Sequence, residues 1–299
     1  MRRQRTSLIA AVTLVIAQAL AACSGDPIAG PSDTPKDEGN VIPPPSDGTQ
    51  SRTLRGFVGD TIARPLVGAA VEVLDGPQAG SVVVTNDSGW FSLVGALADT
   101  TRLRATKEGH VTATGTVAFW RGDGPTDYVT IALAVLAPPV SLAGDYSLTF
   151  VADDACTTLP AEFRTRPYAA TIEPDPNPKS PAGTFLWANI SGVPFLANQR
   201  RIPILIAGDV VAFWLGEHGY GAFFVEQVAP NSYLQFDGGA TVSAGQSPVS
   251  SLSTTFEGAV DYCVTSSPMT GSHYDCDPSR AVTNVHCVST QHRLTLTRR

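Results

Sequence analysis

The side chains best suited to metal binding or nucleophilic chemistry are five histidines and five cysteines among 299 residues. Zinc catalysis needs ligands at spacings such as H-E-x-x-H, with one coordination position left open. No histidine stands in such a pattern, and neither a G-x-S-x-G segment nor a phosphate-binding glycine loop is present. We therefore expect no enzyme activity, no cofactor and no metal. The histidines are His110, His218, His273, His286 and His292.

One short polar segment is the best candidate for ligand contact. Glu217, His218 and Tyr220 lie between two apolar runs, and Trp214 stands just before them. Charged and aromatic side chains in a loop on a rigid β scaffold are typical of binding sites. A polar hairpin turn, built on the glycines of the same segment, explains these residues without a ligand. Both interpretations stay open, and the four residues are the predicted ligand-binding set.

Four cysteines of the second half predict two disulfides. Cys156, Cys263, Cys276 and Cys287 are even in number and contain no C-x-x-C pair, which favours disulfides in an oxidising compartment over zinc. Cys263 ends one predicted strand and Cys287 begins the next, so the two should face each other across the last hairpin. We therefore expect the pairs Cys263–Cys287 and Cys156–Cys276.

The first 23 residues indicate export. Three arginines among the first five residues precede an uncharged run from 6 to 22, which is too short to span a membrane as a helix. The sequence Leu-Ala-Ala-Cys that ends at Cys23 resembles the lipobox of bacterial lipoproteins, whose cysteine is acylated and becomes the first residue. The resemblance implies a signal peptide over 1–22, lipidation (a palmitate-type anchor) at Cys23, and an extracytoplasmic, membrane-attached protein. An ordinary signal peptide with an incidental cysteine is the alternative.

The resemblance also bears on which membrane holds the anchor. Ser24 stands where an inner-membrane retention signal has Asp, so the outer membrane is favoured if the cell is Gram-negative. The membrane is then a partner through the lipid alone. Cleavage would change the net charge from −7 to −10, because three arginines and no acidic residue are lost. This charge argues against nucleic acid as a partner, since nucleic acid needs a basic surface.

Composition and patterning predict an all-β protein. Gly, Pro, Ser, Thr and Val are abundant, and no long run places apolar residues at helical spacing. Residues 23–52 are rich in proline and cannot build a core, so they predict a disordered tether. Short alternating runs over 53–137, separated by Gly, Pro and Asp turns, predict a β-sandwich.

Several motifs within 53–137 resemble the carboxypeptidase regulatory-like domain. They are Pro65-Leu66-x-Gly68-Ala69, Thr85-x3-Gly89-x-Phe91 and Leu103-x-Ala105-x3-Gly109. The resemblance implies a prealbumin-like sandwich, grouped with carbohydrate-binding-like folds, that acts as an accessory module. Physically, Gly89 suits a positive φ in a turn and Gly68 suits a close approach of strands. The family's peptidase domain is absent.

Residues 138–299 predict an antiparallel β-barrel of about eight sequential strands, with a second β-sandwich as the alternative. Gly144-Asp145-Tyr146 and Arg293 are weakly similar to lipocalins, in which a late arginine closes the base of the barrel. Phe185 and Trp187 share one strand face, as do Phe213 and Leu215, which is typical of core or of a lined cavity. The candidate strands are 144–151, 168–173, 183–190, 202–207, 210–216, 221–228, 232–242, 253–264 and 284–298.

These observations favour a non-enzymatic, membrane-anchored binding or structural module, with carbohydrate or a small apolar ligand as the candidate ligands. An envelope-polymer hydrolase whose site is assembled from barrel loops is one alternative, and a component of an envelope protein assembly is another. A hollow barrel would favour a ligand, and converging carboxylates or histidines would favour an enzyme. A filled barrel with an apolar surface patch would favour assembly.

Overall fold

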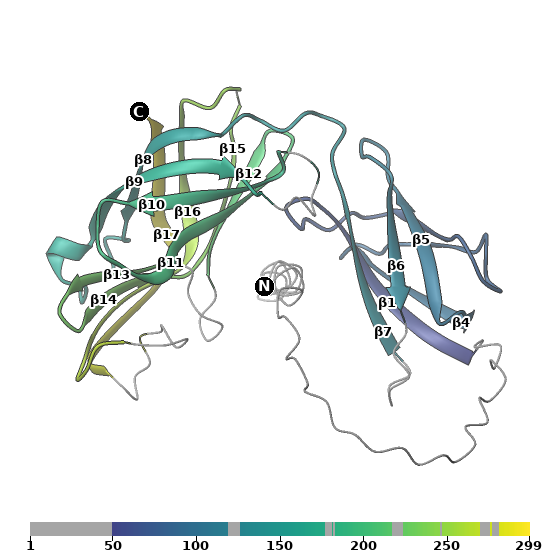
Figure 1. Ribbon diagram of the computed structural model, residues 1–299, viewed down its shortest axis with the longest axis horizontal. Helices are drawn as coiled ribbons and strands as arrows, with labels where there is room; N and C mark the ends of the chain where they lie inside the picture. Colours follow the sequence, from purple (N-terminus) through teal and green to yellow (C-terminus); the bar gives the residue numbers. More distant parts are fainter. Residues whose placement is uncertain are drawn as a thin grey trace, which may run out of the picture. The chain divides into compact units, whose positions relative to one another are not determined.

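The computed structural model describes residues 50–118, 126–176, 181, 183–216, 224–245, 247–269, 276 and 281–299. The predicted signal peptide, Cys23 and nearly all of the predicted tether lie outside this range. The chain forms two compact units, divided between Leu133 and Ala134, and both are built from β-strands (Figure 1). Within the described residues, no helix is long and apolar enough to cross a membrane.

The first unit is the predicted sandwich of two small sheets. One sheet has the order β4 (Trp90–Leu97), β1 (Gln50–Asp60), β7 (Thr126–Leu133), with β1 and β7 parallel. The other has the order β3 (Val82–Val84), β2 (Ala70–Val73), β5 (Thr100–Thr106), β6 (Ala113–Ala118), all antiparallel. Alternate side chains of the strands, among them Leu54, Val71, Leu93, Leu103 and Ile131, form the buried core.

Two glycines of the sandwich explain part of the motif. Gly89 has φ +74 and closes a turn by donating its backbone N–H to the Asn86 carbonyl at 2.9 Å, as predicted. Gly68 has φ +67, and a Cβ there would meet only the Lys107 ammonium at 3.5 Å. Its role is therefore the left-handed backbone conformation, and the expected close approach of strands was wrong.

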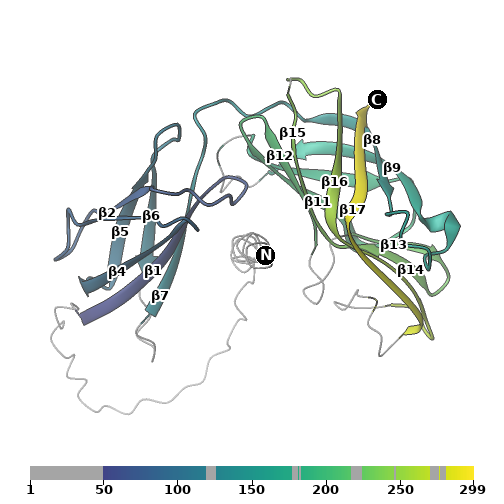
Figure 2. The ribbon, with the colours of Figure 1, turned by 180° about the vertical axis from the view of Figure 1, so that it is seen from behind.

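The second unit is a closed barrel of eight courses, each a single strand or two strands in succession, and each course pairs antiparallel with the next. The eight courses are β8, β9, β10, β11, β12 with β13, β14 with β15, β16 and β17, and β17 pairs back onto β8 (Figure 2). This confirms the predicted barrel against the second-sandwich alternative. The bounds are β8 (Gly144–Val151), β9 (Thr165–Pro174), β10 (Phe185–Ser191), β11 (Phe195–Ala207), β12 (Val210–Gly216), β13 (Phe224–Ala229), β14 (Ser232–Phe236), β15 (Gly238–Ser243), β16 (Ser251–Thr265) and β17 (Ala281–Arg298); the short 3-10 helix η1 (Ala161–Phe163) precedes β9.

Aromatic rings fill the barrel around Phe150. Its ring centroid lies 4.6 Å from that of Phe236, 5.6 Å from Phe224 and 5.9 Å from Phe256. The Tyr168 ring lies 6.0 Å from that of Phe150 and 5.0 Å from that of Phe224. These side chains are almost completely buried. They occupy the space that an internal ligand would need at this level of the barrel.

An arginine other than the expected one connects β17 to the start of β8, where these two strands close the barrel. The Arg298 guanidinium lies 5.6 Å from the centroid of the Tyr146 ring and donates to the Ala143 carbonyl at 3.2 Å. Arg293 pairs with Val151, at the opposite end of β8 from Gly144. The prediction for Arg293 was therefore wrong, because the last strand continues five residues beyond it.

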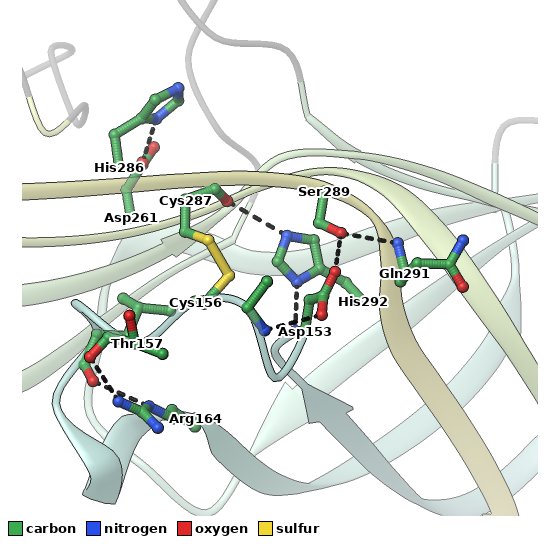
Figure 3. The surroundings of a disulfide bond; sticks show 12 residues. Asp153, Cys156, Thr157, Arg164, Asp261, His286, Cys287, Ser289, Gln291 and His292 are labelled. Atoms are coloured by element: carbon green, nitrogen blue, oxygen red, sulfur yellow. Dashed lines mark hydrogen bonds and ion pairs between the residues drawn. A yellow bond between two sulfur atoms is a disulfide. The ribbon is translucent and has the colours of Figure 1, made fainter.

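The two disulfides are Cys156–Cys287, drawn in Figure 3, and Cys263–Cys276, so the predicted pairing was wrong. Residue pairing between β16 and β17 sets Cys263 opposite Asn284, and Cys287 opposite Val260. Cys263 and Cys287 thus stand three positions apart. Because side chains alternate along a strand, they point to opposite faces of the sheet. Cys287 faces the segment that follows β8, where Cys156 lies. Cys263 faces away from the barrel core, toward Cys276.

Candidate functional site

The predicted ligand-binding set is only partly described. Trp214 is half-buried in β12, on the outer face of the barrel, because Phe213 and Leu215 point into the core. Glu217, His218 and Tyr220 lie outside the described residues. The flanking strands β12 and β13 both pair with β11 and not with each other. They therefore do not form the hairpin considered in the sequence.

Two further aromatic side chains of the barrel also face outward. Phe185 and Trp187 are half-buried, with ring centroids 5.2 Å apart, whereas the intervening Leu186 is in the core. The Arg201 guanidinium lies 6.0 Å from the centroid of the Trp187 ring. We call Phe185, Trp187 and Arg201 the barrel platform. Phe213 and Leu215 are core residues, as their spacing indicated.

Serine, aspartate and histidine side chains meet beside the first disulfide, but they do not form a catalytic triad (Figure 3). Ser289 donates its hydroxyl proton to the Asp153 carboxylate rather than to an imidazole. The His292 Nδ1 accepts the backbone N–H of Asp153 at 3.0 Å, and its Nε2 faces the Cys287 carbonyl at 3.3 Å. Both imidazole nitrogens are thus used by the backbone, and His292 is positioned as a structural bridge.

Burial controls the ionisation of this cluster. Removal from water lowers the pKa of His292, against the opposing effects of the Cys287 carbonyl and the Asp153 and Asp237 carboxylates. The ring stacks on Phe256 at 4.9 Å. A backbone hydrogen bond from Ala155 and the Ser289 hydroxyl lower the pKa of Asp153. The neutral imidazole and charged carboxylate together hold the end of β8 to β17.

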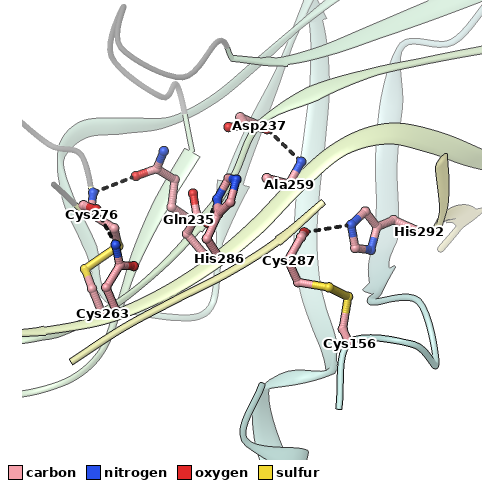
Figure 4. Close-up of polar contacts among 11 residues, drawn as sticks. Cys156, Gln235, Asp237, Ala259, Cys263, Cys276, His286, Cys287 and His292 are labelled. Atoms are coloured by element: carbon pink, nitrogen blue, oxygen red, sulfur yellow. Dashed lines mark hydrogen bonds and ion pairs between the residues drawn. A yellow bond between two sulfur atoms is a disulfide. The ribbon is translucent and has the colours of Figure 1, made fainter. Parts of the chain in front are cut away.

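A polar row crosses the outer face of the barrel next to the second disulfide (Figure 4). Gln235 pairs with Asp261 across β14 and β16, and Asp261 pairs with His286 across β16 and β17. The His286 Nδ1 lies 2.5 Å from the Asp261 carboxylate, and Gln235 Oε1 accepts the Cys276 N–H at 3.2 Å. The row therefore ties the Cys276 backbone to the sheet.

Inside the barrel, a buried carboxylate is bound by two side chains of β9. Arg166 forms a two-point ion pair with Glu226, and the Tyr168 hydroxyl donates to the same carboxylate at 2.8 Å. Burial and the Glu226 charge raise the pKa of Tyr168 well above its usual value. Burial lowers the pKa of Arg166, but the Glu226 contacts outweigh it and the net shift is upward. The positive charge of Arg166 and the negative charge of Glu226 thus cancel inside the barrel.

Sequence reasoning missed these clusters because each combines residues from distant strands. No local spacing links Arg166 to Glu226, or Gln235 to His286. Only the strand pairing brings them together. Within the described residues, no three His, Cys, Asp or Glu side chains are placed to hold a metal ion.

The outer face of the three-stranded sandwich sheet carries a further aromatic group. Trp90 packs against Phe57 at 5.2 Å and against Tyr128 at 5.3 Å between ring centroids. Phe57 is buried, whereas Tyr128 is 48% exposed. Arg55 pairs with Ser92 on one side and with Tyr128 on the other. We call Arg55, Phe57, Trp90 and Tyr128 the sandwich platform.

Comparison with known proteins supports the sandwich. Residues 53–134 match the family model of the carboxypeptidase regulatory-like domain. No curated protein matches the chain. Among solved structures, a 3-chlorocatechol 1,2-dioxygenase from Rhodococcus opacus is 14% identical over 41% of this chain and 77% of its own, with a TM-score of 0.25. A protein of unknown function from Bacteroides fragilis, thought to be membrane-associated, is 11% identical over 83% of this chain and 97% of its own, with a TM-score of 0.24. Likenesses this weak carry no argument about chemistry.

Proposed function

We propose that this chain is a lipid-anchored, extracytoplasmic binding module without catalytic activity. One observation carries the proposal: the rings at the centre of the barrel pack against one another, while other aromatic side chains lie on the outer faces of both domains. The match to a regulatory-like domain supports a binding or structural role. The Ser289, Asp153 and His292 side chains, which could have indicated an enzyme, are used to hold strands together.

The anchor is tested by replacing Cys23→Ala in the full-length chain. Two or more acyl chains bind membranes stably, so the wild type should stay in the membrane fraction through a high-salt wash. The variant should move to the soluble fraction, with its fold unchanged by circular dichroism. Persistent membrane association of the variant at high salt would contradict the anchor. A Ser24→Ala variant is the matched control and should fractionate like the wild type.

Participation in an envelope assembly is a second candidate, supported by the edge of the sandwich. Strand β3 pairs only with β2 among the described strands, and its Val82 and Val84 side chains are 55% and 61% exposed. An unpaired strand edge can accept a strand from another protein. Replacing Val84→Lys should reduce crosslinking to neighbouring proteins in intact cells. An unchanged crosslinking pattern would argue against this edge.

A further inference from the structure

The sandwich platform presents a cation that has not been neutralised. The other four arginines of the described sandwich each have an acidic partner: Arg52 with Asp99, Arg64 with Asp60, Arg102 with Asp75 and Arg104 with Glu72. Arg55 is exposed and has no ion pair or hydrogen bond within the described chain. An arginine without an acidic partner keeps its planar, five-donor guanidinium available for an external carboxylate.

Strand pairing places this cation among aromatic rings. Ser92, Arg55 and Tyr128 form one cross-strand row on the outer face, and Trp90, Phe57 and Thr130 form the next. The Tyr128 ring meets the Trp90 ring edge to face, and Trp90 packs in turn against the buried Phe57, so Tyr128 is held by Trp90 and remains half-exposed. The surface therefore offers a packed ring that has little side-chain freedom to lose on binding, beside an exposed guanidinium whose ordering costs side-chain entropy.

From this arrangement we infer that the sandwich platform binds an acidic polysaccharide, with a sugar ring against Tyr128 and its carboxylate on Arg55. One face of a pyranose ring exposes C–H bonds, which pack on an aromatic ring, while the hydroxyls at its rim stay in water. A carboxylate on the same sugar can accept two guanidinium N–H bonds. The inference rests on the proposed binding function and assigns it a ligand class and a surface.

The barrel platform is the rival location, and its geometry is less suitable. Arg201 lies over the Trp187 ring itself, so the cation covers the aromatic surface that a sugar would need. In the sandwich, Arg55 stands beside Tyr128 in the neighbouring strand. The two platforms therefore provide matched variants for one experiment.

The test is affinity electrophoresis of the full mature chain, carrying Cys23→Ala for solubility, through gels containing polygalacturonate. Carboxyl-reduced polygalacturonate reports stacking without charge, and polyglutamate reports charge without sugar. The chain should be retarded most by polygalacturonate. Arg55→Gln should weaken that binding about tenfold or more and leave the reduced polymer unaffected. Tyr128→Ala should weaken binding to both polysaccharides about fivefold.

Arg201→Gln and Trp187→Ala are the controls and should bind like the unmodified chain. Loss of binding in these variants alone would overturn the inference and leave a binding module with its site on the barrel. Equal retardation by polyglutamate, or no retardation by polygalacturonate, would also overturn it. Neither result bears on the membrane anchor, which is tested by fractionation. All variants must first show the cooperative melting of the parent chain.

Discussion

The two disulfides should differ measurably in what they contribute to stability. Cys156–Cys287 joins residues 131 positions apart and Cys263–Cys276 joins residues 13 apart. In the chain-entropy model, closing these loops stabilises the folded state by about 5 and about 3 kcal/mol respectively. The difference of about 2 kcal/mol is more secure than either value, because the constant contribution to loop closure cancels.

The perturbation is a pair of double variants, Cys156→Ala with Cys287→Ala, and Cys263→Ala with Cys276→Ala. Urea unfolding of each gives the free energy of unfolding of the barrel. The long-range variant should lose about 2 kcal/mol more, or melt about 4–8 °C lower for a domain of this size. The sandwich contains no cysteine, so its own transition is the internal control and should not move.

An equal loss in the two variants, or a larger loss for Cys263–Cys276, would refute the reasoning from loop length. A disulfide that acts mainly by fixing the folded state, rather than by restricting the unfolded chain, would give that result. The pairing itself is checked by a non-reducing peptide map. A peptide linking Cys263 to Cys287 would contradict the register between β16 and β17.

Three further outcomes are expected. Because the pKa of His292 is lowered from 6.5 in the folded protein, the unfolded chain binds the proton more readily as the pH falls. The free energy of unfolding should therefore be highest above about pH 6.5 and decline below it. Urea midpoints measured from pH 5 to 8 should show this decline, and His292→Gln should make them less dependent on pH. Glu226→Leu should cost about 3 kcal/mol by leaving Arg166 unpaired, and adding Arg166→Met should restore most of that loss in chemical denaturation; equal losses in the single and double variants would argue against the pair. Gly258→Ala should cost about 1–3 kcal/mol, since its Cβ would lie 2.0 Å from the Asp237 carbonyl oxygen, and an unchanged melting temperature would contradict that close contact.

Alternation of side chains predicted most of the architecture. Apolar side chains at every second position indicate a strand with one buried face. Tyr146, Leu148 and Phe150 have this spacing, and all three are buried. Tertiary register was not predictable in the same way. Cys287 lies seven residues into a strand that begins at Ala281, three residues earlier than expected. The register of this strand on β16 sets Cys287 opposite Val260, three positions from Cys263, and an odd offset of this kind puts the two side chains on opposite faces of the sheet.

The candidate site was less predictable than the strands. Phe185, Trp187, Phe213 and Leu215 all have the spacing of core residues, yet the first two face outward. Period two identifies residues that share a face but does not say which face is buried. Arg55 could not be recognised either, because the strand pairing decides which arginines of the described sandwich meet an acidic side chain and which do not. The sequence shows which residue types are available for the sandwich platform. Only the pairing of β1 with β4 and β7 shows that they lie side by side.

The pairing of β8 with β17 has a consequence for how the chain matures. Synthesis proceeds from the N-terminus, and the edge of β8 stays uncovered until β17, whose 18 residues run from Ala281 to Arg298, has been made. Until then, the sheet that runs from β8 to β16 has an open edge on which other chains can pair. The sandwich is complete much earlier, with its final strand ending at Leu133. A nascent chain would thus pass through a stage in which the sandwich is folded and the barrel is still an open sheet. At this stage the chain is most exposed to association with other chains.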